Sequence, residues 1–130
     1  MDTIGEIMAA ANLKPETLLE HKDNKYLRNF IEAAYIPEKK FNLPEGDPPY
    51  KENKAHEEQL RGTFWQMAKK IELFQRTDIT AFRRESMFVN ALEALPDSEA
   101  QLLIAAKEQS LPKMYKKLTF KNLQEVGYFA

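Results

Sequence analysis

The side chains most able to do chemistry in this sequence are two histidines, a scattered set of acids and three serines. Metal binding or acid–base catalysis needs histidines and carboxylates at spacings that bring them together. The histidines, His21 and His56, stand beside charged neighbours and form no HxxxH or HExxH pattern. The acids lie three or four residues from a lysine or arginine, as Glu72 does from Arg76, which is ordinary spacing for helix-surface ion pairs. We therefore expect no metal site and two histidines at the surface.

The sequence also lacks the motifs that are typical of nucleophilic catalysis and of nucleotide binding. Ser86, Ser98 and Ser110 are not part of a GxSxG motif, and the four glycines are too widely separated to form a phosphate-binding loop. The chain contains no cysteine, which excludes disulfides, thiolate zinc sites and thiol nucleophiles together. The sequence predicts no catalytic residue and no cofactor, so we expect a protein that is not an enzyme.

Basic side chains gather in two stretches that could bind a partner. Residues 61–84 hold six Lys or Arg against two acids, and residues 107–130 hold five against two. Arg83 and Arg84 fall in the first turn of a predicted helix, where the helix dipole disfavours each cation by about 0.3 to 1 kcal/mol. Either an anionic partner favours them there, or they pair with acids of the same chain such as Glu57 and Glu58. The candidate interaction residues are Trp65, Arg76, Arg83, Arg84, Tyr50, Lys69 and Lys70.

The elements that must position these residues are helices, beginning with several short ones in residues 1–36. Thr3 and Glu6 form a capping box for the first helix. Asn24 precedes another helix, whose apolar face ends before Pro37. We expect a cluster of short helices in this third of the chain.

Residues 37–53 form a proline-rich segment that cannot be regular helix. Four of the seven prolines fall here, and Phe41 and Tyr50 provide apolar anchors. The run "DPPYKEN" lacks the spacing of a PPxY ligand motif, because the tyrosine comes one residue too early. We interpret the segment as an ordered connection, while an aromatic side chain on a restricted loop leaves a binding role for Tyr50 open.

Residues 54–130 are expected to form the helical core. The longest helix is predicted from Asn53 to about Arg76, with a buried stripe formed by Leu60, Phe64, Met67, Ile71 and Phe74. Trp65 lies off this stripe, and Gly62 would cost about 1 kcal/mol relative to alanine inside a helix. Together they suggest a second contact face.

Three further helices complete the prediction. The first runs from Thr80 to Leu95 with a wide apolar arc that includes Phe82, and we expect it to be central. A capping box of Ser98 and Gln101 opens the next, which stops before Pro112. The last spans residues 119–126. The fold class is therefore all-α: one compact domain, 1–130, with about six helices and an ordered Pro-rich loop in the middle.

The length and the charge of the chain are typical of a single domain that does not cross a membrane. A chain of 130 residues can bury a core without a metal or disulfide. The formal net charge of −1 gives no overall attraction to nucleic acid or to an anionic membrane. No apolar run reaches the roughly 18 residues of a membrane span, and the first residues, "MDTIGEIMAA", carry acids where a signal peptide carries basic residues. We expect a cytoplasmic protein.

Several longer runs of the sequence form a recognisable pattern: "IGEIMAAAN", "LPEGDPPYKEN", "RRESMFVNALEAL", "EAQLLIAAKEQSLP" and "LTFKNLQEVGYF". Together they resemble a family of small uncharacterised proteins from large contractile-tailed bacteriophages. The resemblance covers most of the chain, although "HEEQLRGTFWQM" departs from it and leaves Trp65 without support. It implies a phage product made in the bacterial cytoplasm, and it assigns no catalytic residue.

The sequence is compatible with three functions. The leading hypothesis is a non-enzymatic phage accessory protein, active in host takeover, that binds an unidentified protein of host or phage. One alternative is nucleic-acid binding through residues 61–84 and 107–121, and another is a minor structural component of the virion. The oligomeric state is also open, because wide apolar arcs suit either a buried helical hairpin or a dimer interface.

Overall fold

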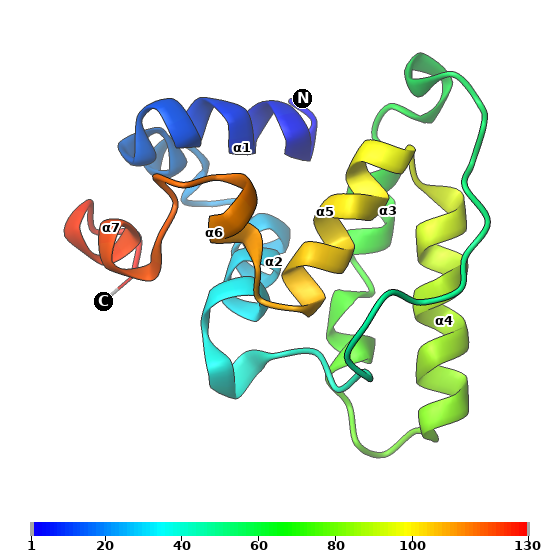
Figure 1. The fold of residues 1–130 in the computed structure, drawn as a ribbon. Coiled ribbons are helices and arrows are strands. Elements are labelled where there is room, and N and C mark those ends of the chain that lie inside the picture. Colours follow the sequence, from blue (N-terminus) through cyan, green and yellow to red (C-terminus); the bar gives the residue numbers. More distant parts are fainter. Residues whose placement is uncertain (1, 130) are drawn as a thin grey trace.

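The computed structural model describes residues 2–129, which are helices and loops without a strand (Figure 1). The α-helices are α1 (Ile4–Leu13), α2 (Lys25–Tyr35), α3 (Thr63–Ala68), α4 (Ala81–Ala94), α5 (Asp97–Lys107), α6 (Leu111–Met114) and α7 (Phe120–Glu125). Four 3₁₀ helices lie between them: η1 (Pro15–His21), η2 (Pro37–Lys39), η3 (Glu57–Leu60) and η4 (Ile71–Phe74). The predicted all-α class is confirmed.

Local signals in the N-terminal third work as predicted. Thr3 Oγ1 accepts a hydrogen bond from the Glu6 backbone N at 3.2 Å, and Glu6 Oε1 accepts one from the Thr3 backbone N at 2.8 Å, so the capping box of α1 is complete. Asn24 caps α2 by accepting from the backbone N–H groups of Tyr26 and Leu27. These caps set where each helix begins, because they satisfy donors that the first turn leaves unpaired.

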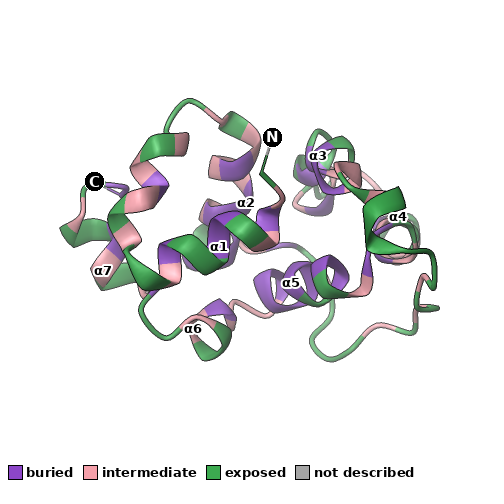
Figure 2. Cartoon of the chain, turned by 90° about the horizontal axis from the view of Figure 1, so that it is seen from above, coloured by how far each residue is buried: buried purple, intermediate pink, exposed green. Residues whose placement is uncertain are grey.

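The helix at the centre of the fold is α5, whereas the sequence predicted that the preceding helix, α4, would be central. In Figure 2, most of α5 is coloured as buried, and the helix lies between the group of α1, α2 and α7 and the group of α3 and α4. Leu102, Leu103 and Ala106 are each at most 2% exposed. The neighbouring α4 buries one face only, through Arg84, Phe88 and Leu92. Its wide apolar arc is therefore only partly used by the core.

Aromatic side chains join the two groups of helices into one core. Phe30 of α2 packs edge-on against Phe64 of α3, with ring centroids 5.2 Å apart. Phe74 of η4 contacts both Phe88 of α4 and Phe41 of the connecting loop in the same way, at 5.2 and 5.5 Å. Such contacts between distant segments add to the burial of apolar area.

The predicted long helix from Asn53 to Arg76 is wrong. This stretch is divided into η3, α3 and η4, and Gly62 has a φ of 89°, a left-handed conformation that interrupts a helix and that glycine adopts without steric cost. Phe64, Ile71 and Phe74 are nevertheless buried, as the stripe predicted. The apolar spacing was correctly recognised, and α3 and η4 both contact α2, although they do not form one continuous helix.

The Pro-rich segment is an ordered connection that lies along α4 and α5 (Figure 1). Lys107 of α5 is 2% exposed, and its Nζ donates to the carbonyl oxygens of Pro44 and Gly46 at 2.9 and 2.8 Å and to the Glu108 carboxylate. Further along, the backbone N of Lys51 donates to Glu93 Oε2 at 2.8 Å. Polar contacts with α4 and α5 thus hold a segment that has few apolar side chains.

The capping box predicted at Ser98 and Gln101 is also wrong. The residue before the first turn of α5 is Pro96, and no side chain caps this helix. Ser98 Oγ instead donates to Glu57 Oε1 at 2.9 Å, and Gln101 Nε2 donates to the Tyr50 hydroxyl at 2.7 Å. Ser98 therefore binds η3 and Gln101 binds the Pro-rich segment, and neither caps the helix.

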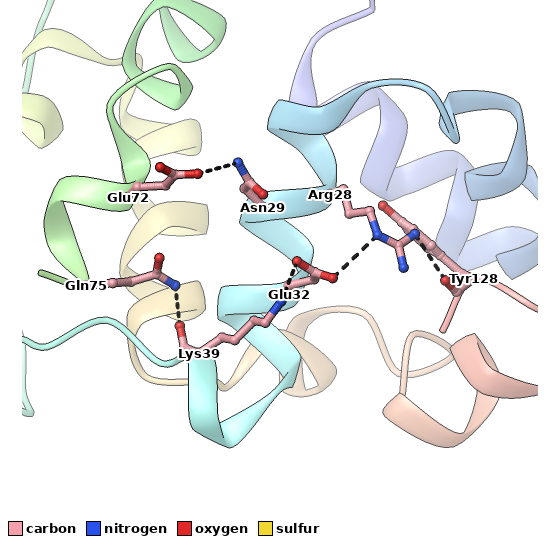
Figure 3. Close-up of polar contacts among 7 residues, drawn as sticks. All are labelled: Arg28, Asn29, Glu32, Lys39, Glu72, Gln75 and Tyr128. Carbon is pink, nitrogen blue, oxygen red and sulfur yellow. Dashed lines mark hydrogen bonds and ion pairs between the residues drawn. The ribbon is translucent and has the colours of Figure 1, made fainter. Parts of the chain in front are cut away.

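The last predicted helix is confirmed as α7, which Thr119 caps by accepting from the Asn122 backbone N. Gly127 follows it with a φ of 88° and turns the chain back. Figure 3 shows how α2 receives this end of the chain: Arg28 donates to the carbonyl of Tyr128 and pairs with Glu32. The C-terminal end of the described chain is therefore packed against α2.

Candidate functional site

A surface groove runs between α3 and η4 on one side and α4 on the other. We call it the α3–α4 groove; its volume is about 600 Å³. Most of its wall is apolar, and its principal side chains are Met67, Leu73, Phe74, Met87, Ala91 and Leu95. A pocket of this size lies within the range of roughly 300 to 1,000 Å³ that is typical of binding sites.

Helical spacing explains why the groove exists. Met87 and Ala91 lie four residues apart on one face of α4, next to the face that Phe88 and Leu92 bury in the core, and Leu95 follows directly after the helix. Met67 and Leu73 form the other wall and are half-buried, as are Met87 and Ala91. The apolar arc of α4 is therefore wider than its own core contacts require, and the surplus faces the groove.

The rim of this groove is basic. Lys70 lines it and is exposed, and Arg83 lies one turn before Met87 on the same face of α4. Within residues 2–129, neither cation forms an ion pair, and none of the groove-lining side chains is acidic. Lys69 is exposed beside Lys70. Three of the predicted interaction residues thus remain available for an anionic group.

Phe82 is the exposed aromatic residue at this end of α4. Its side chain is 81% exposed, although the sequence placed it in the buried apolar arc. The prediction was wrong because Phe82 lies at the outer edge of the apolar arc. The buried position in this turn of α4 is taken by Arg84. A large exposed phenylalanine next to an exposed arginine is a surface that a partner can cover.

Arg84 and Arg76 have partners within the chain. Arg84 is 7% exposed, and its guanidinium donates to the carbonyl oxygens of Asn42, Arg76 and Ile79, the last two at 3.0 Å. This accounts for a cation in the first turn of α4 and corrects its assignment to an exposed interaction surface. Arg76 forms an ion pair with Asp78, which raises the pKa of Arg76 and lowers that of the Asp78 carboxyl.

Trp65 and Tyr50 serve chiefly internal contacts. The Trp65 side chain is 9% exposed, packs edge-on against Phe64 at 5.3 Å, and donates from Nε1 to the Asp2 carbonyl at 3.1 Å. The second contact face that the sequence suggested for Trp65 is therefore used, at least in part, by the chain's own residue Asp2. The Tyr50 hydroxyl donates to Asp97 Oδ1 at 2.9 Å, and burial and the nearby Asp97 raise the pKa of Tyr50.

The second basic stretch is divided by the fold. Lys107 is buried beneath the connecting segment, and Lys121 pairs loosely with Glu125 at 4.0 Å. Lys113, Lys116 and Lys117 are exposed. The stretch 107–121 therefore presents fewer free cations than its sequence suggests.

The histidines and acids of the described chain do not form a cluster that could bind a metal ion. His56 is exposed and His21 is half-buried. Among residues 2–129, no three His, Cys, Asp or Glu side chains are placed to hold a metal ion. Across the same residues, none of the helices combines the length and the apolar character that crossing a membrane requires.

Comparisons with known proteins place the chain in a family without assigning it an activity. Neither the curated proteins nor the solved structures contain a match to it. A family described as "Family of unknown function (DUF6433)" matches residues 8–113, a range that includes the α3–α4 groove and the whole connecting segment. The match extends over most of the sequence, and the chain belongs to this family of unknown function.

Proposed function

We propose that this chain is a non-enzymatic accessory protein of a contractile-tailed bacteriophage, which acts in the host cytoplasm by binding another protein of host or phage origin. The phage origin is supported by the resemblance of "LPEGDPPYKEN" and "EAQLLIAAKEQSLP" to proteins of such phages. The binding role rests on one observation: α4 presents apolar side chains to a groove that the rest of residues 2–129 leaves open.

The occupant that fits the α3–α4 groove is an amphipathic segment of the partner, with apolar residues on one face and acids beside them. Met67 and Met87 offer flexible, polarizable side chains that adapt to an inserted apolar residue. Lys70 and Arg83 carry positive charge at the rim, and no lining residue opposes it. A helix that inserts apolar residues at spacings of three and four would place its flanking acids toward this rim.

The distribution of exposed cations favours a protein partner over nucleic acid. A phosphate backbone needs a continuous basic track, but Arg84 and Lys107 are buried in internal contacts and Arg76 pairs with Asp78. Of the exposed cations in residues 61–84, Lys70 and Arg83 border an apolar groove, and apolar walls favour a protein segment over a sugar–phosphate chain. A packaged virion component would also use such a groove, with a virion protein as its partner.

The test compares affinity capture by matched variants from phage-infected cells. Lys70→Glu together with Arg83→Glu reverses the rim charge at two exposed positions, and Lys116→Glu together with Lys117→Glu makes the same change away from the groove. We expect the groove pair to lose the partner at least tenfold and the control pair to retain it, since unlike charges become like charges at the contact.

A second readout establishes that the contact is direct. The captured partner is purified and titrated with the wild-type chain and with Met87→Gln, which keeps the side-chain length but makes the groove wall polar. Weaker binding by Met87→Gln supports docking in the groove. A partner that binds all variants equally, or a complex that nuclease treatment dissolves, contradicts the proposal.

A further inference from the structure

A second hollow, separate from the α3–α4 groove, lies where α1, η3 and the first turn of α5 meet. Its volume is about 410 Å³. Glutamates from all three helices line it, namely Glu6 of α1, Glu57 and Glu58 of η3 and Glu99 of α5, and Arg61 is the basic lining residue. We call it the glutamate pocket. Four carboxylates face one guanidinium there, which leaves an excess of negative charge.

The internal contacts of the pocket account for only part of this charge. Glu6 Oε1 accepts from Arg61 Nη2 at 2.9 Å and from the Thr3 backbone N at 2.8 Å, so Glu6 and Arg61 form a pair. Glu57 Oε1 accepts from the neutral Ser98 hydroxyl at 2.9 Å. Beyond the Glu6–Arg61 pair, Glu57, Glu58 and Glu99 add further negative charge to the lining.

Glu99 differs from the other three because it is buried. Its side chain is 7% exposed, and its Oε1 has no hydrogen-bond donor among residues 2–129. Buried carboxylate oxygens in folded proteins are normally paired, since removing one from water without a donor is unfavourable. A carboxylate that lacks a donor and lines a hollow is completed by a ligand that brings one.

We propose that the glutamate pocket binds a primary ammonium group, carried either by a small aliphatic diamine or by a lysine side chain. An ammonium donates three hydrogen bonds from one positive centre, which suits several carboxylates around a hollow. A metal ion would require those oxygens to converge at about 2.0 to 2.6 Å from one point. No such cluster exists in residues 2–129, so the pocket favours the organic cation.

Binding of the ammonium depends on the ionisation of Glu99. Burial raises the pKa of Glu99 to about 7, the nearby Glu57 adds to the effect, and Arg61 opposes it. Glu6 and Glu58 line the same pocket from α1 and η3. The ionised fraction of Glu99 rises from about a tenth at pH 6 to about nine tenths at pH 8, while an alkyl ammonium stays charged throughout. Binding should therefore tighten about tenfold over this range, with release of a proton.

Isothermal titration calorimetry of the full chain tests the proposal with two probes, 1,5-diaminopentane and Nα-acetyl-lysine amide, at pH 6 and pH 8 and constant ionic strength. We expect saturable binding at pH 8 that is about tenfold weaker at pH 6. The probe that binds more tightly identifies the source: the diamine indicates a free polyamine, and the blocked lysine indicates a side chain of a partner protein.

Matched variants locate the site. Glu99→Gln keeps the size of the side chain and should weaken binding at pH 8 about tenfold while removing the difference between pH 6 and pH 8. Glu20→Gln removes the same charge from an exposed position in η1 and should bind as the wild type does. Glu58→Gln, at an exposed residue of the pocket, should weaken binding several-fold, and it keeps the test valid if Glu99→Gln folds poorly.

The proposal fails if neither probe binds at about 10 mM, which corresponds to less than roughly 3 kcal/mol of binding free energy. It also fails if Glu99→Gln and Glu58→Gln bind as the wild type does, or if Mg²⁺ binds while both ammonium probes do not.

Discussion

Replacing Glu99 with glutamine should change how the stability of the fold depends on pH. Burial raises the pKa of Glu99 from an ordinary value of 4.5 to about 7 in the folded chain. The folded state therefore keeps a proton that the unfolded state releases. The resulting stabilisation is complete below pH 4.5, declines as the pH rises, and is lost above about pH 7.

The size of the effect follows from the difference between the two pKa values. Each unit corresponds to about 1.4 kcal/mol, so a difference of 2.5 units makes the contribution of Glu99 at pH 8 about 3 kcal/mol less favourable than at pH 4. Glutamine has no proton to lose. The free energy of unfolding of Glu99→Gln, relative to the wild type, should thus rise by up to about 3 kcal/mol between pH 4 and pH 8.

Urea unfolding at a series of pH values measures this difference, and the buried Trp65 provides a fluorescence signal. Glu6, Asp78 and Glu108 have lowered pKa values and act in the opposite direction, but they are common to both proteins and cancel in the comparison. If wild type and Glu99→Gln show the same pH dependence, Glu99 is not a buried acid with a raised pKa, and the reasoning is refuted.

Two further predictions concern stability. Gly62→Ala should destabilise the fold by about 1 to 2 kcal/mol, because an alanine at a φ of 89° is strained. Thermal unfolding measures this loss, and an unchanged unfolding midpoint would mean that η3 and α3 are joined differently. Arg84→Ala should cost about 1 to 3 kcal/mol, because three carbonyl oxygens lose their donor, whereas Arg83→Ala should cost less than about 0.5 kcal/mol; equal losses in urea unfolding would contradict the buried position of Arg84.

Short-range signals in the sequence predicted much of the fold. Thr3, Asn24 and Thr119 precede helices because their side chains satisfy backbone donors only a few residues away. The proline-rich segment was recognised as an ordered connection for a similar reason, since proline restricts its own backbone. In such cases the cause and the effect lie within one helical turn.

Errors arose where a residue has a distant partner. Ser98 and Gln101 have the spacing of a capping box, but Glu57 of η3 binds Ser98 and Tyr50 of the Pro-rich segment binds Gln101. Arg84 was taken for a surface cation because the carbonyl of Asn42 is 42 residues away in sequence. Gly62 separates η3 from α3 through a left-handed φ of 89°, which the apolar spacing around it does not indicate. Periodicity carries no information about these tertiary contacts.

The candidate sites were only partly predictable. Lys69, Lys70 and Arg83 were correctly placed at the surface, but the apolar groove beside them requires knowing which face of α4 the core leaves free. The glutamate pocket was missed because its acids come from three helices that are distant in sequence. The one available signal was that Glu99, at the third position of α5, has no lysine or arginine three or four residues away in sequence.

Photo-crosslinking from inside the α3–α4 groove tests the central claim most directly. A benzoylphenylalanine residue at Met87, in the groove, is compared with one at the exposed Lys22, which lies directly after η1. Upon irradiation in infected cells, the Met87 position should crosslink to one protein, at a segment in which apolar residues alternate with acids at helical spacing. Crosslinks from Lys22 to that protein with none from Met87 would show that the groove is not the docking site.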